Sequence, residues 1–350
     1  MKLTAAKCSG ALLVMVAAYV AIDSVGSAGA QVQQQTQQQT QQQTQQQMQQ
    51  TPQAPPASPQ SSPPAPMPKQ RQPIRIQTDL VNILASVVDA NGEPVIGLPQ
   101  TAFQVFEENV EQKIVRFEPQ TNRPLDLALL VDTSGSATIE LKIERDAAER
   151  FVKEVVRSGD RLAVFSFTSD VVQLCNFSDD PKVLENAVHR VEAAPDMGTS
   201  LYDAVVLGAQ AVKRQGAGRR RALVIITDAG ETTSVSKFDA TRRAAIASDA
   251  LLYTVVVRPM KSDAGWNTAG EHAMETITDS TGGAMFYPTN VSELEGIFDQ
   301  INRELRTQYL LSYYPTPAPP AGSTRHLAVK VNTGDMVRYR KEYFTAPAPR

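Results

Sequence analysis

The residues in this sequence best suited to chemistry are an aspartate and two serines at alternate positions, Asp132, Ser134 and Ser136. They follow residues 125–131, a largely apolar run that is typical of a buried strand. One carboxylate and two hydroxyls are hard oxygen donors, the kind that Mg²⁺ prefers in proteins. The segment after this strand is therefore predicted to form part of a divalent-cation site.

Two further segments carry oxygen donors at the ends of predicted elements. Thr199 comes just before a predicted helix over residues 201–215, and Asp228 follows a predicted strand over residues 221–227. In an open α/β sheet, ligands bind where loops leave the carboxyl ends of the strands. We therefore expect one shared site, completed by water or a ligand, with side chains from Asp132, Ser134, Ser136, Thr199 and Asp228. The alternative is that the hydroxyls only cap helices and that Asp132 only fixes a turn.

Strands alternate with amphipathic helices over residues 123–307. For example, residues 137–157 place Ile143, Ala147 and Phe151 at helical spacing. The other predicted strands cover 161–167, 171–177, 221–227, 251–257 and 284–287, and the other predicted helices open at Pro181 or cover 201–215, 237–248, 270–281 and 292–306. This alternation predicts a doubly wound α/β domain with a mostly parallel sheet and helices on both faces.

The segments on either side of this domain, residues 74–122 and 308–347, have the alternating pattern of β-strands. Their predicted strands cover 76–88, 103–106, 114–117, 309–314, 326–331 and 337–344. Each segment has roughly 40 residues, too few to bury a sufficient core alone. The simplest arrangement is one small all-β sandwich into which the α/β domain is inserted.

The first 73 residues are predicted to lie outside the fold. Residues 1–30 have two lysines, an apolar stretch over residues 11–22 and small residues ending at Ala30, the pattern of a secretory signal peptide cleaved after Ala30. The apolar stretch is too short to span a membrane, so we expect a secreted or periplasmic protein without a transmembrane segment after cleavage. Residues 31–73 are rich in Gln and then Pro and are predicted to be a disordered linker, either a spacer or an expanded repeat.

The net charge argues against one class of function, and the cysteine content bears on disulfide formation. The 350 residues carry a net charge of -3 and show no basic stripe, which argues against nucleic-acid binding. Once the signal peptide is removed, Cys175 is the only cysteine, so no intrachain disulfide is expected.

The three oxygen-bearing segments resemble the von Willebrand factor A domain family. The family pattern D-x-S-x-S matches residues 132–136, its G-T-S-L-Y-D-A-like stretch matches residues 198–204, and its T-D-G-like turn matches residues 227–229. The three motifs occur in the family's order, and the β segments that flank the domain are similar to a bacterial secreted subgroup. Ala229 and Met197 stand where the family commonly has glycine, which bears on the shape of the loops.

The resemblance implies a metal-ion-dependent adhesion site. Ser134, Ser136 and Thr199 would bind Mg²⁺, or Mn²⁺ or Ca²⁺, through their hydroxyls, while Asp132 and Asp228 would balance its charge directly or through water. An open coordination position would accept an acidic side chain from a protein partner. The implied function is that of an exported, non-catalytic binding or adhesion protein.

Two other functions stay open at this point. The first is a Mg²⁺-dependent hydrolase or phosphotransferase with Asp132 as nucleophile, although phosphoaspartyl enzymes of the D-x-D type have a second carboxylate where this chain has Ser134, and no Walker-type phosphate loop is present. The second is an envelope scaffold with a vestigial metal site.

Overall fold

The computed structural model describes residues 80–119, 123–134, 138–194, 197–216, 218–257 and 268–347. The predicted signal peptide and linker lie outside the described residues, as does Ser136. The described residues belong to one compact unit, Ile74–Arg350. No helix in this part of the chain is both long enough and apolar enough to cross a membrane.

The centre of this unit is a six-stranded sheet with the strand order β10-β9-β8-β5-β6-β7. Its strands are β5 (Leu125–Asp132), β6 (Arg161–Phe167), β7 (Val171–Ser178), β8 (Arg220–Thr227), β9 (Ala250–Val256) and β10 (Ala284–Phe286). Only the edge strand β7 is antiparallel to its neighbour. Every residue of β5 and β9 is buried, because a parallel sheet is covered on both faces, and this explains their continuous apolar runs. The predicted fold class is confirmed.

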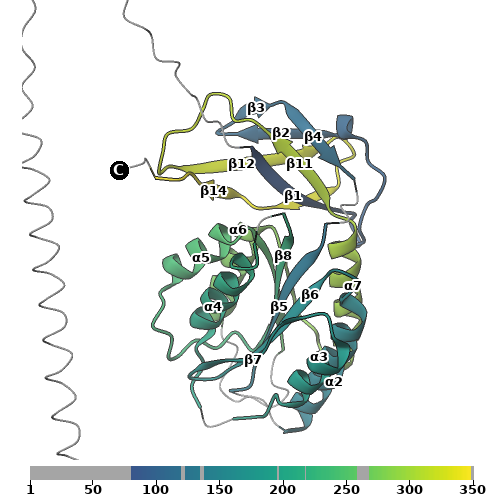
Figure 1. The fold of residues 1–350 in the computed structure, drawn as a ribbon, viewed down its shortest axis with the longest axis vertical. Helices are drawn as coiled ribbons and strands as arrows, with labels where there is room; N and C mark the ends of the chain where they lie inside the picture. Colours follow the sequence, from purple (N-terminus) through teal and green to yellow (C-terminus); the bar gives the residue numbers. More distant parts are fainter. Residues whose placement is uncertain are drawn as a thin grey trace, which may run out of the picture. The chain divides into compact units, whose positions relative to one another are not determined.

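Helices cover both faces of this sheet (Figure 1). One face packs against α2 (Thr138–Val155), α3 (Pro181–His189) and α7 (Leu294–Arg306) and the other against α4 (Leu201–Lys213), α5 (Phe238–Ala247) and α6 (Thr268–Thr281). On the first face the rings of Phe151 and Phe298 stack with centroids 4.7 Å apart. The α3 helix begins at Pro181 as predicted, and the side chain of Asp180 accepts a hydrogen bond from the Lys182 backbone N–H.

The flanking segments form two four-stranded sheets, in the orders β13-β1-β11-β4 and β14-β12-β2-β3. Their strands are β1 (Val81–Val88), β2 (Phe103–Glu107), β3 (Val110–Gln112), β4 (Ile114–Glu118), β11 (Tyr309–Tyr313), β12 (Thr324–Val331), β13 (Met336–Tyr339) and β14 (Glu342–Phe344). Two short 3₁₀ helices complete the described elements, η1 (Gln100–Ala102) before β2 and η2 (Val291–Glu293) before α7. Each sheet combines strands from before and after the α/β domain, since β1 pairs with β11 and β2 pairs with β12. Their shared core includes Ile83, Phe103 and Tyr309, so each segment supplies the apolar face that the other must bury.

One predicted strand, residues 337–344, is in fact two strands, β13 and β14, in different sheets. At the break, the backbone N–H of Lys341 donates to the carbonyl of Ser280 (3.0 Å) at the end of α6, and its carbonyl accepts from the Leu327 N–H (2.8 Å). Apolar alternation does not reveal this change of sheet, because it depends on a contact with a helix 60 residues away in sequence.

A buried ion pair connects the α/β domain to the sandwich. Glu304 of α7 is fully buried and accepts hydrogen bonds from Arg338 Nη1 of β13 (2.7 Å) and from the Tyr253 hydroxyl of β9 (3.2 Å). Burial raises the pKa of the Glu304 carboxyl, against the lowering effect of Arg338. Breaking a buried ion pair is costly because the remaining charge is left without a partner.

Replacing Arg338 by alanine should therefore lower the free energy of unfolding by about 3–5 kcal/mol, measured by urea denaturation at neutral pH. Because the folded-state pKa of Glu304 lies above its ordinary value, the variant should recover part of this loss as the pH falls and Glu304 takes up a proton. Arg303→Ala is the matched control, since Arg303 pairs with Glu93 on the surface. This variant should lower the free energy of unfolding by less than about 1 kcal/mol. Equal losses in the two variants would contradict the assignment.

Candidate metal centre

The predicted site residues lie at the carboxyl edge of the central sheet. Asp132 is the last residue of β5 and Thr227 the last residue of β8, and these two strands are neighbours with Val131 beside Ile226. Loops from adjacent parallel strands therefore leave the sheet side by side. No group of three His, Cys, Asp or Glu side chains that could hold a metal occurs in the described residues, so the donors at this edge are mainly hydroxyls accompanied by two aspartates.

Asp132 is buried, with 5% of its surface exposed, and both of its carboxylate oxygens accept hydrogen bonds. Oδ1 accepts from the Ser134 hydroxyl (2.6 Å) and the Ser134 backbone N–H (3.1 Å), while Oδ2 accepts from the Thr227 hydroxyl (2.6 Å). The sequence analysis did not assign Thr227 a role. Its signal was present in the sequence, since it is a hydroxyl residue at the end of a strand that neighbours β5.

Thr199 joins this cluster from a different loop. Its hydroxyl lies 2.6 Å from the hydroxyl of Ser134, which is 65 residues earlier in the chain. The side chains of Thr199, Ser134, Asp132 and Thr227 thus form one continuous hydrogen-bonded chain across three loops. The structure brings the predicted residues Asp132, Ser134 and Thr199 together and adds Thr227 to them. Ser136 lies outside the described residues, and its contribution stays a sequence-based prediction.

Asp228 faces the same small space as Thr199. Its Oδ1 accepts from the Gly230 N–H (2.7 Å), and a Cβ atom added to Gly230 would lie 2.8 Å from Asp228 Oδ1 and 3.5 Å from the Thr199 hydroxyl. Ala229, between Asp228 and Gly230 in the sequence, is buried and has a φ of 62°, in the left-handed region that favours glycine. This conformation accounts for the usual glycine at that position, and the alanine here adopts it at a cost of roughly 1–2 kcal/mol.

The loop that follows Asp228 is fastened to the start of α4. Glu231 accepts from the Tyr202 backbone N–H (2.9 Å), and the Asp203 carboxylate accepts from the backbone N–H groups of Val235 (2.8 Å) and Ser236 (3.0 Å). Burial tends to raise the pKa of Asp203, but these hydrogen bonds lower it below its ordinary value overall. Glu231 and Asp203 therefore hold the loops that carry Thr199 and Asp228 rather than facing the cluster themselves.

The charge at this edge of the sheet is negative and uncompensated. Burial raises the pKa of Asp132 to about 6, the hydrogen bonds from Ser134 and Thr227 oppose this shift, and the negative charge of Asp228 adds to it. Within the described residues, no Lys, Arg or His forms an ion pair with Asp132 or Asp228. Two carboxylates and two hydroxyls without a basic partner suit a hard divalent cation in chemistry and in charge.

The raised pKa of Asp132 predicts a pH-dependent stability in the metal-free protein. A carboxyl with a folded-state pKa of about 6 and an ordinary value of 3.8 stabilises the fold below pH 3.8 and loses that contribution as the pH rises through 6. At 1.36 kcal/mol per pKa unit, the loss is about 3 kcal/mol. In EDTA, the unfolding free energy of the wild type should therefore fall by about this amount, relative to Asp132→Asn, between about pH 4 and pH 7.

Urea denaturation at a series of pH values measures this difference. The control is Asp170→Asn, which changes an exposed aspartate. Its unfolding free energy should depend on pH as that of the wild type does. A constant difference between the wild type and Asp132→Asn at all pH values would show that burial of Asp132 does not carry the effect.

One family model matches the part of the chain that carries this edge of the sheet. A family model for the von Willebrand factor type A domain matches residues 127–231, a range that includes Asp132, Ser134, Ser136, Thr199 and Asp228. No curated protein matches the chain significantly.

Several solved structures match the chain at low sequence identity and with TM-scores below 0.5. An aerotolerance-related membrane protein from Bacteroides fragilis is 16% identical, with 52% of this chain and 98% of that chain covered and a TM-score of 0.41. A von Willebrand factor type A protein from Catenulispora acidiphila is 11% identical, with 77% and 74% covered and a TM-score of 0.45. The von Willebrand factor domain of the type V pili tip protein Mfa5 from Porphyromonas gingivalis is 12% identical, with 52% and 95% covered and a TM-score of 0.41.

The family match, the doubly wound sheet and the oxygen-lined edge at Asp132 agree with one another. Residues 127–231 are therefore similar to the von Willebrand factor type A domain family.

Proposed function

We propose that this protein is a non-catalytic binding protein whose von Willebrand factor type A domain holds a divalent cation and, through it, an acidic side chain of a protein partner. The observation that carries the proposal is the buried cluster of Asp132, Ser134 and Thr199, in which a carboxylate and two hydroxyls converge without a basic residue. Export from the cell, which rests on the sequence of residues 1–30, belongs to the same proposal.

Each residue has a definite part in this function. Ser134 and Thr199 supply neutral hydroxyl donors, Asp228 supplies a partly exposed carboxylate, and Ser136 adds a third hydroxyl. Asp132 balances the charge from its buried position and is oriented by Thr227. The cation, when bound, supplies a positive centre that attracts a carboxylate from the partner, and hard oxygen donors favour Mg²⁺ or Mn²⁺ at such a centre.

The environment of Asp132 supports binding rather than catalysis. Both of its carboxylate oxygens already accept hydrogen bonds from Ser134 and Thr227, and the side chain is buried. A nucleophilic carboxylate must present one oxygen to its substrate. Ser134 also occupies the position at which enzymes of the D-x-D type have a second carboxylate.

Removal of the buried carboxylate or of one hydroxyl should strongly weaken metal binding without unfolding the protein. We expect saturable binding of Mn²⁺ to the full chain by isothermal titration calorimetry, and a loss of affinity of at least about 100-fold in Asp132→Ala and in Thr199→Val, since each variant removes a donor or a charge from the cluster. Thr276→Val, which removes a hydroxyl from α6, is the matched control and should bind as the wild type does.

Partner binding is tested with the same variants. Immobilised wild-type protein should retain partners from a cell-envelope extract in Mg²⁺ and release them in EDTA, and Asp132→Ala should retain none of them. Retention of the same partners by Asp132→Ala in EDTA would refute the metal-dependent mechanism.

The role of Thr227 can be separated from that of the proposed ligands. Thr227→Val keeps the shape of the side chain but removes the hydrogen bond to Asp132 Oδ2, so Mn²⁺ affinity should fall by about 10–100-fold, as for other residues that orient a metal ligand. Thermal melts in EDTA check that the fold is retained. An unchanged affinity would mean that Asp132 is positioned without Thr227.

A further inference from the structure

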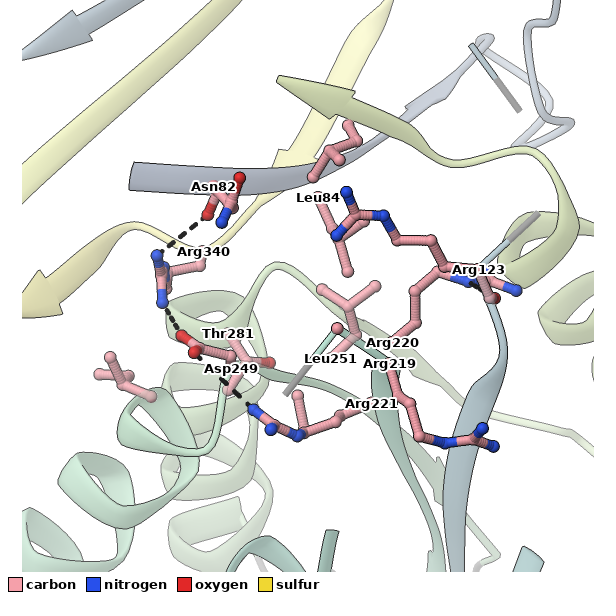
Figure 2. A pocket seen from close by; sticks show the side chains of 14 residues that line it. Asn82, Leu84, Arg123, Arg219, Arg220, Arg221, Asp249, Leu251, Thr281 and Arg340 are labelled. Carbon is pink, nitrogen blue, oxygen red and sulfur yellow. Dashed lines mark hydrogen bonds and ion pairs between the residues drawn. The ribbon is translucent and has the colours of Figure 1, made fainter. Parts of the chain in front are cut away.

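A second site lies at the opposite edge of the central sheet, where β8 and β9 begin beneath the sandwich. A cavity of about 300 Å³ opens there, with polar residues around its wall and Leu84 and Leu251 among its apolar residues (Figure 2). Its charged lining residues are Arg123, Arg219, Arg220, Arg221, Arg340 and Asp249. Five arginines thus share the cavity with one carboxylate, in a chain whose net charge is negative.

Arg220 is the most deeply buried of these arginines, with 4% of its surface exposed. Its guanidinium donates to neutral acceptors, namely the Arg123 carbonyl (2.8 Å), the Leu305 carbonyl and the Gln308 side chain (3.2 Å). No carboxylate forms an ion pair with it in the described part of the chain. Burial lowers the pKa of Arg220 to about 10, and the nearby charge of Arg306 lowers it further.

Arg221 and Arg340 share the single carboxylate. Arg340 pairs with Asp249 and also donates to the Asn82 carbonyl (3.1 Å), whereas Arg221 Nη1 lies 3.9 Å from Asp249 Oδ2. The Nε atom of Arg221 is buried and has no hydrogen-bond partner among the described residues. Figure 2 shows Asp249 between the guanidinium groups of Arg340 and Arg221.

Carboxylates outside the cavity remove only part of this surplus of positive charge, since Arg123 pairs with Glu118 (3.3 Å). In Figure 2 the guanidinium of Arg219 points away from the cavity, and it pairs with Asp126 (2.8 Å), which also binds Arg161 (3.0 Å). One buried aspartate is therefore shared by two arginines. The positive charge of Arg220 and part of that of Arg221 and Arg340 still lack an anion.

We propose that this cavity is an anion-binding site that takes a phosphate or sulfate group of a small molecule beside Arg221 and Arg340, the two arginines that share Asp249. A guanidinium presents several donors in a plane and matches the oxygens of a tetrahedral anion. The cavity volume is at the lower end of the range for small-molecule sites. Asp249 acts as an internal competitor, because it occupies the guanidinium groups that the ligand would use.

The site would also couple the two parts of the fold. Arg340 and Asn82 belong to the sandwich region, whereas Arg221 belongs to β8 of the α/β domain. An anion held by both sets of residues stabilises their packing. The site does not depend on the proposed metal centre, which lies at the other edge of the sheet.

Titration of the full chain with inorganic phosphate tests the proposal, in EDTA and at constant ionic strength. We expect saturable binding by calorimetry, weakened by at least about tenfold in Arg221→Gln because a charged donor is lost. Arg150→Gln removes a surface arginine of α2 and should leave the affinity unchanged. Asp132→Ala should also leave it unchanged, which separates this site from the metal centre.

Asp249→Asn is the decisive variant, because it predicts a gain. Asp249 has a φ of 57°, a conformation that asparagine adopts readily, so the fold should be retained. Removal of the competing charge should tighten phosphate binding by at least about fivefold. If Arg221→Gln fails to fold, this gain still tests the site.

The relative affinities for different anions distinguish a site for a single tetrahedral group from a site for a polyphosphate ester. Equal affinity for sulfate and phosphate supports a site for a single tetrahedral group, and tighter binding of pyrophosphate supports a site for a polyphosphate ester. The proposal is overturned if phosphate does not saturate at millimolar concentration, if chloride displaces it equally well, if Arg150→Gln weakens binding as much as Arg221→Gln, or if Asp249→Asn brings no gain.

Discussion

The burial of one carboxylate, Asp132, is the constraint on which the rest of the candidate metal centre depends. A buried anion must be hydrogen-bonded, and the described groups that bond to Asp132 come from the segment just after its own strand and from the end of the neighbouring strand β8. Ser134 and Thr227 meet this need, and Ser134 in turn contacts Thr199. The requirement to satisfy Asp132 therefore fixes the relative positions of three loops that are distant in sequence.

The two edges of the central sheet differ in charge for a reason that lies in the fold. Parallel strands place all their carboxyl ends at one edge and all their amino ends at the other. The carboxyl edge holds Asp132 and Asp228, whereas the amino edge begins with the arginines at the start of β8. Opposite charges thus gather about 20 Å or more apart, given the rise of about 3.3 Å per residue over a strand of this length, and each edge suits a ligand of the opposite sign.

The strands of the sandwich are bonded to helices of the inserted domain. The α7 helix leads directly into β11, Glu304 of α7 pairs with Arg338 of β13, and Lys341 between β13 and β14 bonds to the end of α6. These contacts determine where the last strands of the chain change sheet. The last strands of the sandwich are therefore bonded to α6 and α7 of the inserted domain.

The sequence by itself determined the class of the fold and the chemical type of the site. Largely apolar runs such as residues 125–131 predict buried parallel strands, because such strands are buried on both faces, and D-x-S-x-S predicts an oxygen-rich loop after the strand. The tertiary structure alone decided which hydroxyl orients Asp132, where residues 337–344 bend into two strands, and that five arginines and Asp249 line one cavity. The physical reason is that strand pairing and burial act over long sequence separations, whereas composition and periodicity report only on a residue's near neighbours.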